Sequence, residues 1–137
     1  MITAKVTESK ISAEELAAIV KSNSAGAVVT FSGDVRNHDK GKEVLTLVYE
    51  IHPSAPKVIE AISNEVAAMH QVENVATAHR YGPIPIGESA FVVAVSAAHR
   101  DAALKCCAEL VERVKAELPI WKYQTFADGS TEWVNSA

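Results

Sequence analysis

Cysteine is scarce in this sequence, and its two copies, Cys106 and Cys107, are adjacent inside a predicted helix. Neighbouring cysteines make a poor structural disulfide, and a metal or redox site needs spaced cysteines with further ligands, which the sequence lacks. We therefore expect both thiols to stay reduced and one of them to face the core. This usage of cysteine is typical of a cytoplasmic protein.

Long apolar runs and a surplus of basic residues are also missing. The longest apolar stretch, residues 90–98, is broken by Ser96 and is far shorter than the roughly 20 residues that span a membrane. The first five residues lack the apolar core of an export signal, so no export is expected. The net charge of −4 argues against a dedicated nucleic-acid-binding protein. The glycines fall in neither of the spacings that mark nucleotide-binding loops.

Apolar residues are plentiful, at 48% of the 137 residues. That content is sufficient for one hydrophobic core, and no repeat, linker or low-complexity segment divides the chain. We therefore expect a single domain that spans residues 1–137.

Hydrophobic periodicity predicts three helices and seven strands. The first helix should begin at Ser12, which with Glu15 fits a capping box, and the second should be capped by Ser54. The expected helices cover about residues 13–22, 55–70 and 101–117, and the expected strands cover residues 2–6, 27–32, 44–51, 75–81, 90–97, 121–126 and 132–134. Strands 27–32 and 44–51 suit a hairpin. The order indicates an α+β fold, with a mixed, mainly antiparallel sheet and helices packed on it.

Two lysines lie on either side of a predicted chain reversal. Lys115 occupies the last turn of a helix that Pro119 should end, and Lys122 opens the following strand. The reversal should bring the two ammonium groups together, where they repel each other unless an anion lies between them. A lysine held near other cations has a lowered pKa and can act as a nucleophile or a general base.

Other cationic residues occupy the ends of predicted strands. Arg36 lies in a polar, glycine-bounded loop, residues 33–42, that follows a buried strand. His99 and Arg100 lie where an apolar strand meets the N-terminus of a helix, a position that favours anions. A cationic cluster of this kind in an acidic chain predicts a focused anion site and group transfer on a phosphorylated small molecule.

Each of these residues also has an ordinary structural explanation. Lys115 can simply interact with the helix dipole, Arg36 can belong to a solvated hairpin loop, and His99 can cap its helix. His79 and Arg80, which precede a Gly-Pro turn, are interpreted as structural or interfacial residues.

Residues 26–38, GAVVTFSGDVRNH, resemble the GAVVTFxGxVRNH segment of the molybdopterin synthase large (catalytic) subunit family. Further matches keep the same order along the chain, up to about residue 134. They are Tyr49-Glu50, His79-Arg80-Tyr81-Gly82, Ile86-Gly87-Glu88, residues 96–100, Lys115, residues 119–122, Asp128-Gly129 and Trp133-Val134. Each piece alone is weak, whereas the ordered set is specific.

The resemblance implies an α/β hammerhead-type fold and a central homodimer. Each large subunit of the family binds one small ubiquitin-like sulfur-carrier subunit, which gives a heterotetramer. The C-terminal Gly-Gly tail of the carrier, activated as a thiocarboxylate, enters a pocket of the large subunit. Sulfur then moves onto cyclic pyranopterin monophosphate, and two transfers form the dithiolene of molybdopterin. This sulfurtransferase step is expected to need no metal or cofactor.

The resemblance also assigns site residues. Lys115 and Lys122 match the two pocket lysines, which would contact the thiocarboxylate and handle proton transfer or a covalent intermediate. Arg36 and Arg100 would bind the phosphate or the polar edge of the pterin. The full substrate-binding set is Asp34, Val35, Arg36, His99, Arg100, Lys115, Lys122, Tyr123 and Gln124, and Phe31 and Trp121 would shape the pocket.

Two positions depart from the family pattern: Asp34 replaces a basic or neutral residue, and Gln124 replaces an expected Glu. Two alternatives to catalysis stay open. One is a binding module that holds an anionic ligand without chemistry, and the other is a structural partner subunit.

Overall fold

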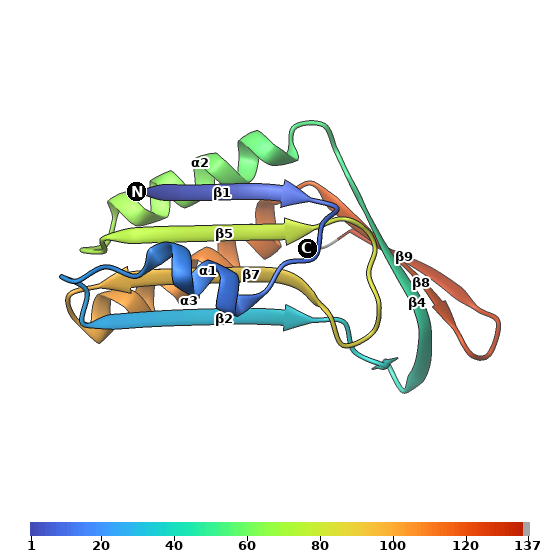
Figure 1. The fold of residues 1–137 in the computed structure, drawn as a ribbon. Coiled ribbons are helices and arrows are strands. Elements are labelled where there is room, and N and C mark those ends of the chain that lie inside the picture. The colour runs from blue at the N-terminus through green and yellow to red at the C-terminus, as the bar shows by residue number, and fades with distance from the viewer. Residues whose placement is uncertain (136–137) are drawn as a thin grey trace.

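The computed structural model describes residues 1–135, which form two sheets and three helices. The elements in chain order are β1 (Ile2–Thr7), α1 (Ala13–Val20), β2 (Ala27–Asp34), β3 (His38–Asp39), β4 (Lys42–Ile51), α2 (Ala55–Ala68), β5 (Asn74–Arg80), β6 (Gly82–Pro83), β7 (Ser89–Ala97), α3 (Arg100–Glu117), β8 (Ile120–Phe126) and β9 (Thr131–Val134) (Figure 1). All the predicted helices and strands are present, and two short strands, β3 and β6, are added.

The strands form two sheets rather than the single sheet that was predicted. The first has the order β1-β5-β7-β2, in which β1 and β5 are parallel and the other pairs antiparallel. The second has the order β3-β4-β8-β9, with β6 also paired to β4, and all its pairs are antiparallel. The α+β class with mainly antiparallel pairing is therefore confirmed.

The predicted hairpin between residues 27–32 and 44–51 is wrong. Strand β2 pairs with β7, and β4 pairs with β8. The reason lies in β7, which is buried along its length from Ala90 to Ala97 and therefore takes a central position with a strand on either side. Short sequence separation favoured the hairpin, but burial of this distant apolar strand decided the pairing.

Helices cover both faces of the first sheet: α2 and α3 lie behind it and α1 lies in front (Figure 1). Residues of β7 alternate between these layers. Val93 belongs to the core beneath α2 and α3, with Leu110, whereas Val92 packs with Leu16 of α1. The second sheet extends from the end of this sandwich, so the junction of the two sheets lies at the end of β2 where Asp34 is found.

The helix ends bear out most of the predicted signals. The backbone N–H of Glu15 donates to Ser12 Oγ at 3.1 Å, which confirms the first cap. Ser54 makes no such capping bond, and its hydroxyl lies 2.8 Å from His52 Nδ1 instead. Helix α3 ends at Glu117, as Pro119 predicted.

Both cysteines of α3 are buried, although only one was expected to be. Burial raises the pKa of Cys106 to about 12 and that of Cys107 to about 11, so neither thiol is activated. Across residues 1–135, no helix is both long enough and apolar enough to cross a membrane.

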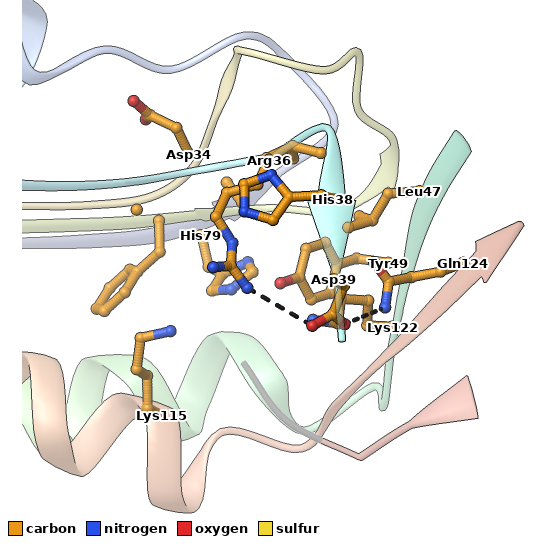
Figure 2. Close-up of a pocket in the computed structure, with 14 residues that line it drawn as sticks. Asp34, Arg36, His38, Asp39, Leu47, Tyr49, His79, Lys115, Lys122 and Gln124 are labelled. Atoms are coloured by element: carbon orange, nitrogen blue, oxygen red, sulfur yellow. Dashed lines mark hydrogen bonds and ion pairs between the residues drawn. The ribbon is translucent and has the colours of Figure 1, made fainter. Parts of the chain in front are cut away.

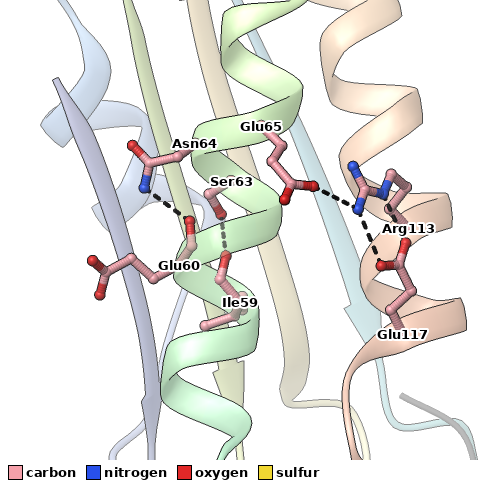
Figure 3. A network of polar contacts seen from close by, with 7 residues as sticks. All are labelled: Ile59, Glu60, Ser63, Asn64, Glu65, Arg113 and Glu117. Atoms are coloured by element: carbon pink, nitrogen blue, oxygen red, sulfur yellow. Dashed lines mark hydrogen bonds and ion pairs between the residues drawn. The ribbon is translucent and has the colours of Figure 1, made fainter.

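Polar contacts hold α2 against its neighbours on both sides (Figure 3). Arg113 of α3 donates to Glu65 of α2 at 2.9 Å and to Glu117, one turn further along its own helix, at 2.7 Å. On the buried side, the Ser63 hydroxyl lies 2.8 Å from that of Thr77 in β5. The Arg113–Glu65 contact thus ties the C-terminal turns of α3, which carry Lys115, to α2.

Candidate functional site

A cavity of about 340 Å³ lies at the junction of the two sheets (Figure 2). Six strands, one loop and one helix contribute to it, among them the end of β2, the last turn of α3 and the middle of β8. We call it the pocket, and its lining residues are Gly33, Asp34, Val35, Arg36, His38, Asp39, Leu47, Tyr49, His79, Ala90, Phe91, Lys115, Lys122 and Gln124.

Lys115 and Lys122 both line the pocket, which confirms the predicted convergence. Leu118 leaves the helical conformation, with φ −67° and ψ 123°, and the chain turns directly into β8. Lys122 shares one face of β8 with the buried residues Ile120 and Gln124, so the alternation of the strand directs it inward.

The two lysines influence each other electrostatically. Partial burial of its side chain lowers the pKa of Lys115, and the nearby Lys122 ammonium lowers it further, while Glu112 opposes the shift. Lys115 is therefore easier to deprotonate than an ordinary surface lysine. Such an amine is suited to accepting a proton or attacking an electrophilic carbon.

The carboxylate of Asp39, which the sequence did not single out, also lines the pocket and contacts two of the predicted site residues. Gln124 Nε2 donates to Asp39 Oδ2 at 2.8 Å, and Arg36 Nη2 lies 3.6 Å from Asp39 Oδ1. The Gln124 hydrogen bond lowers the pKa of Asp39, helped by the positive charges of Lys122 and Arg36. Asp39 therefore supplies a negative charge among these cations.

A tight turn presents Asp39 to the pocket. Lys40 and Gly41, with φ of 51° and 77°, reverse the chain between β3 and β4. This left-handed pair is typical of a two-residue hairpin turn. Lys40 also forms an ion pair with Glu132 of β9 at 3.0 Å. Within the predicted loop 33–42, no sequence signal separated Asp39 from its charged neighbours.

His79 also lines the pocket, whereas the sequence indicated a structural or interfacial role. It is fully buried, its ring stacks on Phe91 with centroids 5.5 Å apart, and the Tyr49 ring meets it edge-on at 4.9 Å. Burial lowers the pKa of His79 to about 4, with the Lys115 charge contributing and a backbone hydrogen bond to Arg80 opposing. Arg80 itself forms an ion pair with Glu88 at 2.7 Å.

Three aromatic residues of the predicted site lie outside the pocket lining. Trp121 and Tyr123 occupy the alternate positions of β8, so they face away from Lys122, and the Tyr123 ring packs against Trp133 at 4.7 Å. The Phe31 ring meets the ring of Phe91, a lining residue, edge-on at 5.8 Å. Side chains alternate between the two faces of a strand, and this alternation could have excluded Trp121 and Tyr123 from the pocket lining at the sequence level.

His99 and Arg100 are separated from the pocket by the length of α3. They are exposed at its N-terminal end, and His99 makes no side-chain capping bond. Fifteen residues of helix correspond to roughly 22 Å, so Arg100 cannot join Lys115 within one chain. Of the predicted site residues, Asp34, Val35, Arg36, Lys115, Lys122 and Gln124 are brought together in the pocket.

The part of the chain that the structure describes has no group of three or more His, Cys, Asp or Glu side chains that could hold a metal ion. The expectation that no cofactor is needed stays a prediction.

Acid should destabilise the fold through His79. Its folded pKa of about 4 lies below the 6.5 of an ordinary histidine, so the unfolded chain binds the extra proton first, and stability should fall as the pH drops from 6.5 to 4. The shift corresponds to about 3 kcal/mol. Urea unfolding of wild type and His79→Gln across this range measures it, with the exposed His52→Gln as control. Parallel pH profiles for wild type and His79→Gln would refute the assignment.

Comparison with known proteins gives consistent matches over most of the chain. The family model described as MoaE protein matches residues 6–117. The molybdopterin synthase catalytic subunit of Bos taurus is 35% identical over 130 residues, covering 94% of this chain and 69% of the relative. That of Rattus norvegicus is 37% identical over 128 residues, covering 93% and 64%. The chain thus spans about two thirds of the length of these curated relatives. The crystal structure of molybdopterin synthase from Staphylococcus aureus superposes with a TM-score of 0.86 at 32% identity, covering 94% of both chains.

Proposed function

The chain belongs to the MoaE protein family, and from that premise we propose that it is the catalytic subunit of a molybdopterin synthase. In this role it transfers sulfur from the C-terminal thiocarboxylate of a small ubiquitin-like carrier to cyclic pyranopterin monophosphate. Two transfers form the dithiolene of molybdopterin. The enzyme is a sulfurtransferase of the cytoplasm.

The observation that carries this proposal is the meeting of Lys115, Lys122 and Arg36 in one pocket of an acidic chain. Three cations around a cavity of about 340 Å³ suit a small anionic ligand or an extended anionic tail. Both reactants of the proposed reaction are anions, since one carries a thiocarboxylate and the other a phosphate.

The lowered pKa of Lys115 supports different roles for the two lysines, with Lys115 as the proton acceptor and Lys122 as an anion-binding residue. The carrier sulfur attacks a substrate carbon and displaces the oxygen that this carbon carries. A C–S bond thus replaces a C–O bond, the oxygen leaves with the bonding electrons, and an acyl–sulfur link to the carrier remains. Water then attacks the acyl carbon, the neutral Lys115 amine takes its proton, and the acyl–sulfur bond breaks. Sulfur stays on the substrate and the carrier leaves as a carboxylate. Lys122 and Arg36 hold the anionic groups throughout.

The remaining predicted contacts need a second copy of the chain. His99 and Arg100 are exposed and lie roughly 22 Å along α3 from Lys115. A homodimer in which this helix end meets the neighbouring pocket would complete the site, and one carrier on each copy would give a heterotetramer. Trp121 and Tyr123, on the outer face of β8, are available to a partner in the same assembly.

Reconstitution tests the proposal. The chain is mixed with a thiocarboxylated carrier and cyclic pyranopterin monophosphate, and we expect molybdopterin to form. Binding of the precursor without turnover would instead favour a binding module. Neither binding nor turnover would favour a structural subunit.

A further inference from the structure

We propose that His79 contacts the bound small molecule, with its Nε2 atom accepting a hydrogen bond from an N–H or O–H group on a flat heterocyclic ligand. The inference rests on the proposed function, because the heterocycle is taken to be the pterin of the substrate. It adds a neutral acceptor to a pocket in which three of the six predicted contacts, Arg36, Lys115 and Lys122, are cationic.

The position of the ring proton follows from one hydrogen bond. His79 Nδ1 lies 2.8 Å from the backbone carbonyl oxygen of Arg80. A carbonyl oxygen can only accept, so Nδ1 carries the proton and donates it. In the neutral ring, Nε2 is left with a lone pair and no hydrogen, which makes it an acceptor.

That lone pair has no partner among residues 1–135, although Nε2 is buried. Buried polar atoms are nearly always hydrogen-bonded, because an unsatisfied one loses its contacts with water without replacement. Arg80 Nε and Ser96 Oγ are also unsatisfied, but neither residue lines the pocket. Among the unsatisfied buried polar atoms of residues 1–135, His79 Nε2 is thus distinguished by its position in the pocket.

The ring is held in place rather than free to turn toward another partner. Phe91 stacks on one face of His79, with an interplanar angle of 17°, and Tyr49 packs edge-on at 80°. All three residues line the pocket. Together they form an aromatic part of the pocket wall, which suits a flat ring.

A protonated His79 ring could not accept a hydrogen bond from the ligand. A charged imidazolium would need an acceptor for its second N–H and would lie near Lys115, and burial lowers the pKa of His79 to about 4. Near neutral pH, Nε2 therefore accepts a hydrogen bond and does not donate one. The pocket thus selects a ligand with an anionic group for the cations and a hydrogen-bond donor on a flat edge, as a pterin monophosphate provides.

Calorimetric titration of the chain without its carrier tests this contact. His79→Phe keeps an aromatic ring at this position but loses the Nε2 acceptor. This variant should therefore bind cyclic pyranopterin monophosphate roughly tenfold more weakly than wild type. His79→Gln restores an acceptor and should recover most of the affinity. A peptide ending in Gly-Gly is the second probe, and its affinity should not change in His79→Phe.

Nitrogen NMR of wild-type protein carrying labelled histidine gives a readout that needs no variant to fold. Saturation with the pterin should move the Nε2 resonance of His79 and leave Nδ1 nearly unchanged. The inference about His79, but not the proposed function, is overturned if the Nε2 resonance does not move. The same conclusion follows if the His79→Phe variant binds the pterin as tightly as wild type does. Weakened binding of the Gly-Gly peptide instead of the pterin also overturns it. A wild-type chain that binds no pterin overturns both this inference and the proposed function.

Discussion

Replacing Lys115 with alanine should reduce molybdopterin formation by about a hundredfold to ten-thousandfold, the range expected for loss of a general base. The amine lies in the pocket beside Lys122, and its lowered pKa makes the neutral form accessible. The rate in wild type should rise with pH through a pKa below 10.5, because only the deprotonated amine accepts a proton. Reconstituted assays of product formation across pH measure both effects.

Two matched variants show whether the loss is chemical. Lys115→Arg keeps the positive charge, but a guanidinium does not lose its proton, so this variant should be nearly as inactive as Lys115→Ala. Lys105→Ala removes an exposed lysine of the same helix and should keep the wild-type rate. A fully active Lys115→Arg would show that charge alone is needed and would contradict the role of a base.

Mixing two inactive variants should restore activity if the site is shared between two copies. Lys115→Ala and Arg100→Ala should each be inactive alone. After subunit exchange, one site of each mixed dimer combines an intact Lys115 with an intact Arg100, so about a quarter of the wild-type rate should return. The measurement is the initial rate of the exchanged mixture.

The control mixture pairs Lys115→Ala with Lys122→Ala. Both lysines line the pocket of one chain, so no mixed dimer contains an intact site and no activity should return. If the Arg100→Ala variant is active alone, Arg100 does not belong to the site. Failure of the first mixture to recover, with exchange verified, would contradict the shared site.

Local sequence signals were sufficient to predict the helices and strands and the convergence of the two pocket lysines. Ser12 caps α1 as its pattern predicted, and Pro119 ends α3 so that Lys122 turns toward Lys115. The family resemblance, and no local signal, placed Trp121 and Tyr123 in the site, although the alternation of β8 turns them away from Lys122. Resemblance identifies positions in a family, whereas strand geometry determines which face a side chain takes.

The sequence by itself determined the helices, the strands and the meeting of the two lysines, because these depend on periodicity, capping and a proline within a few residues. Only the tertiary structure decided that β2 pairs with β7 and that His79 and Asp39 reach the pocket. Strand order and sheet faces follow from burying apolar surfaces of distant segments together, which no local pattern specifies. The lysine pair at Pro119 was therefore predictable, whereas the histidine and the carboxylate that face it were not.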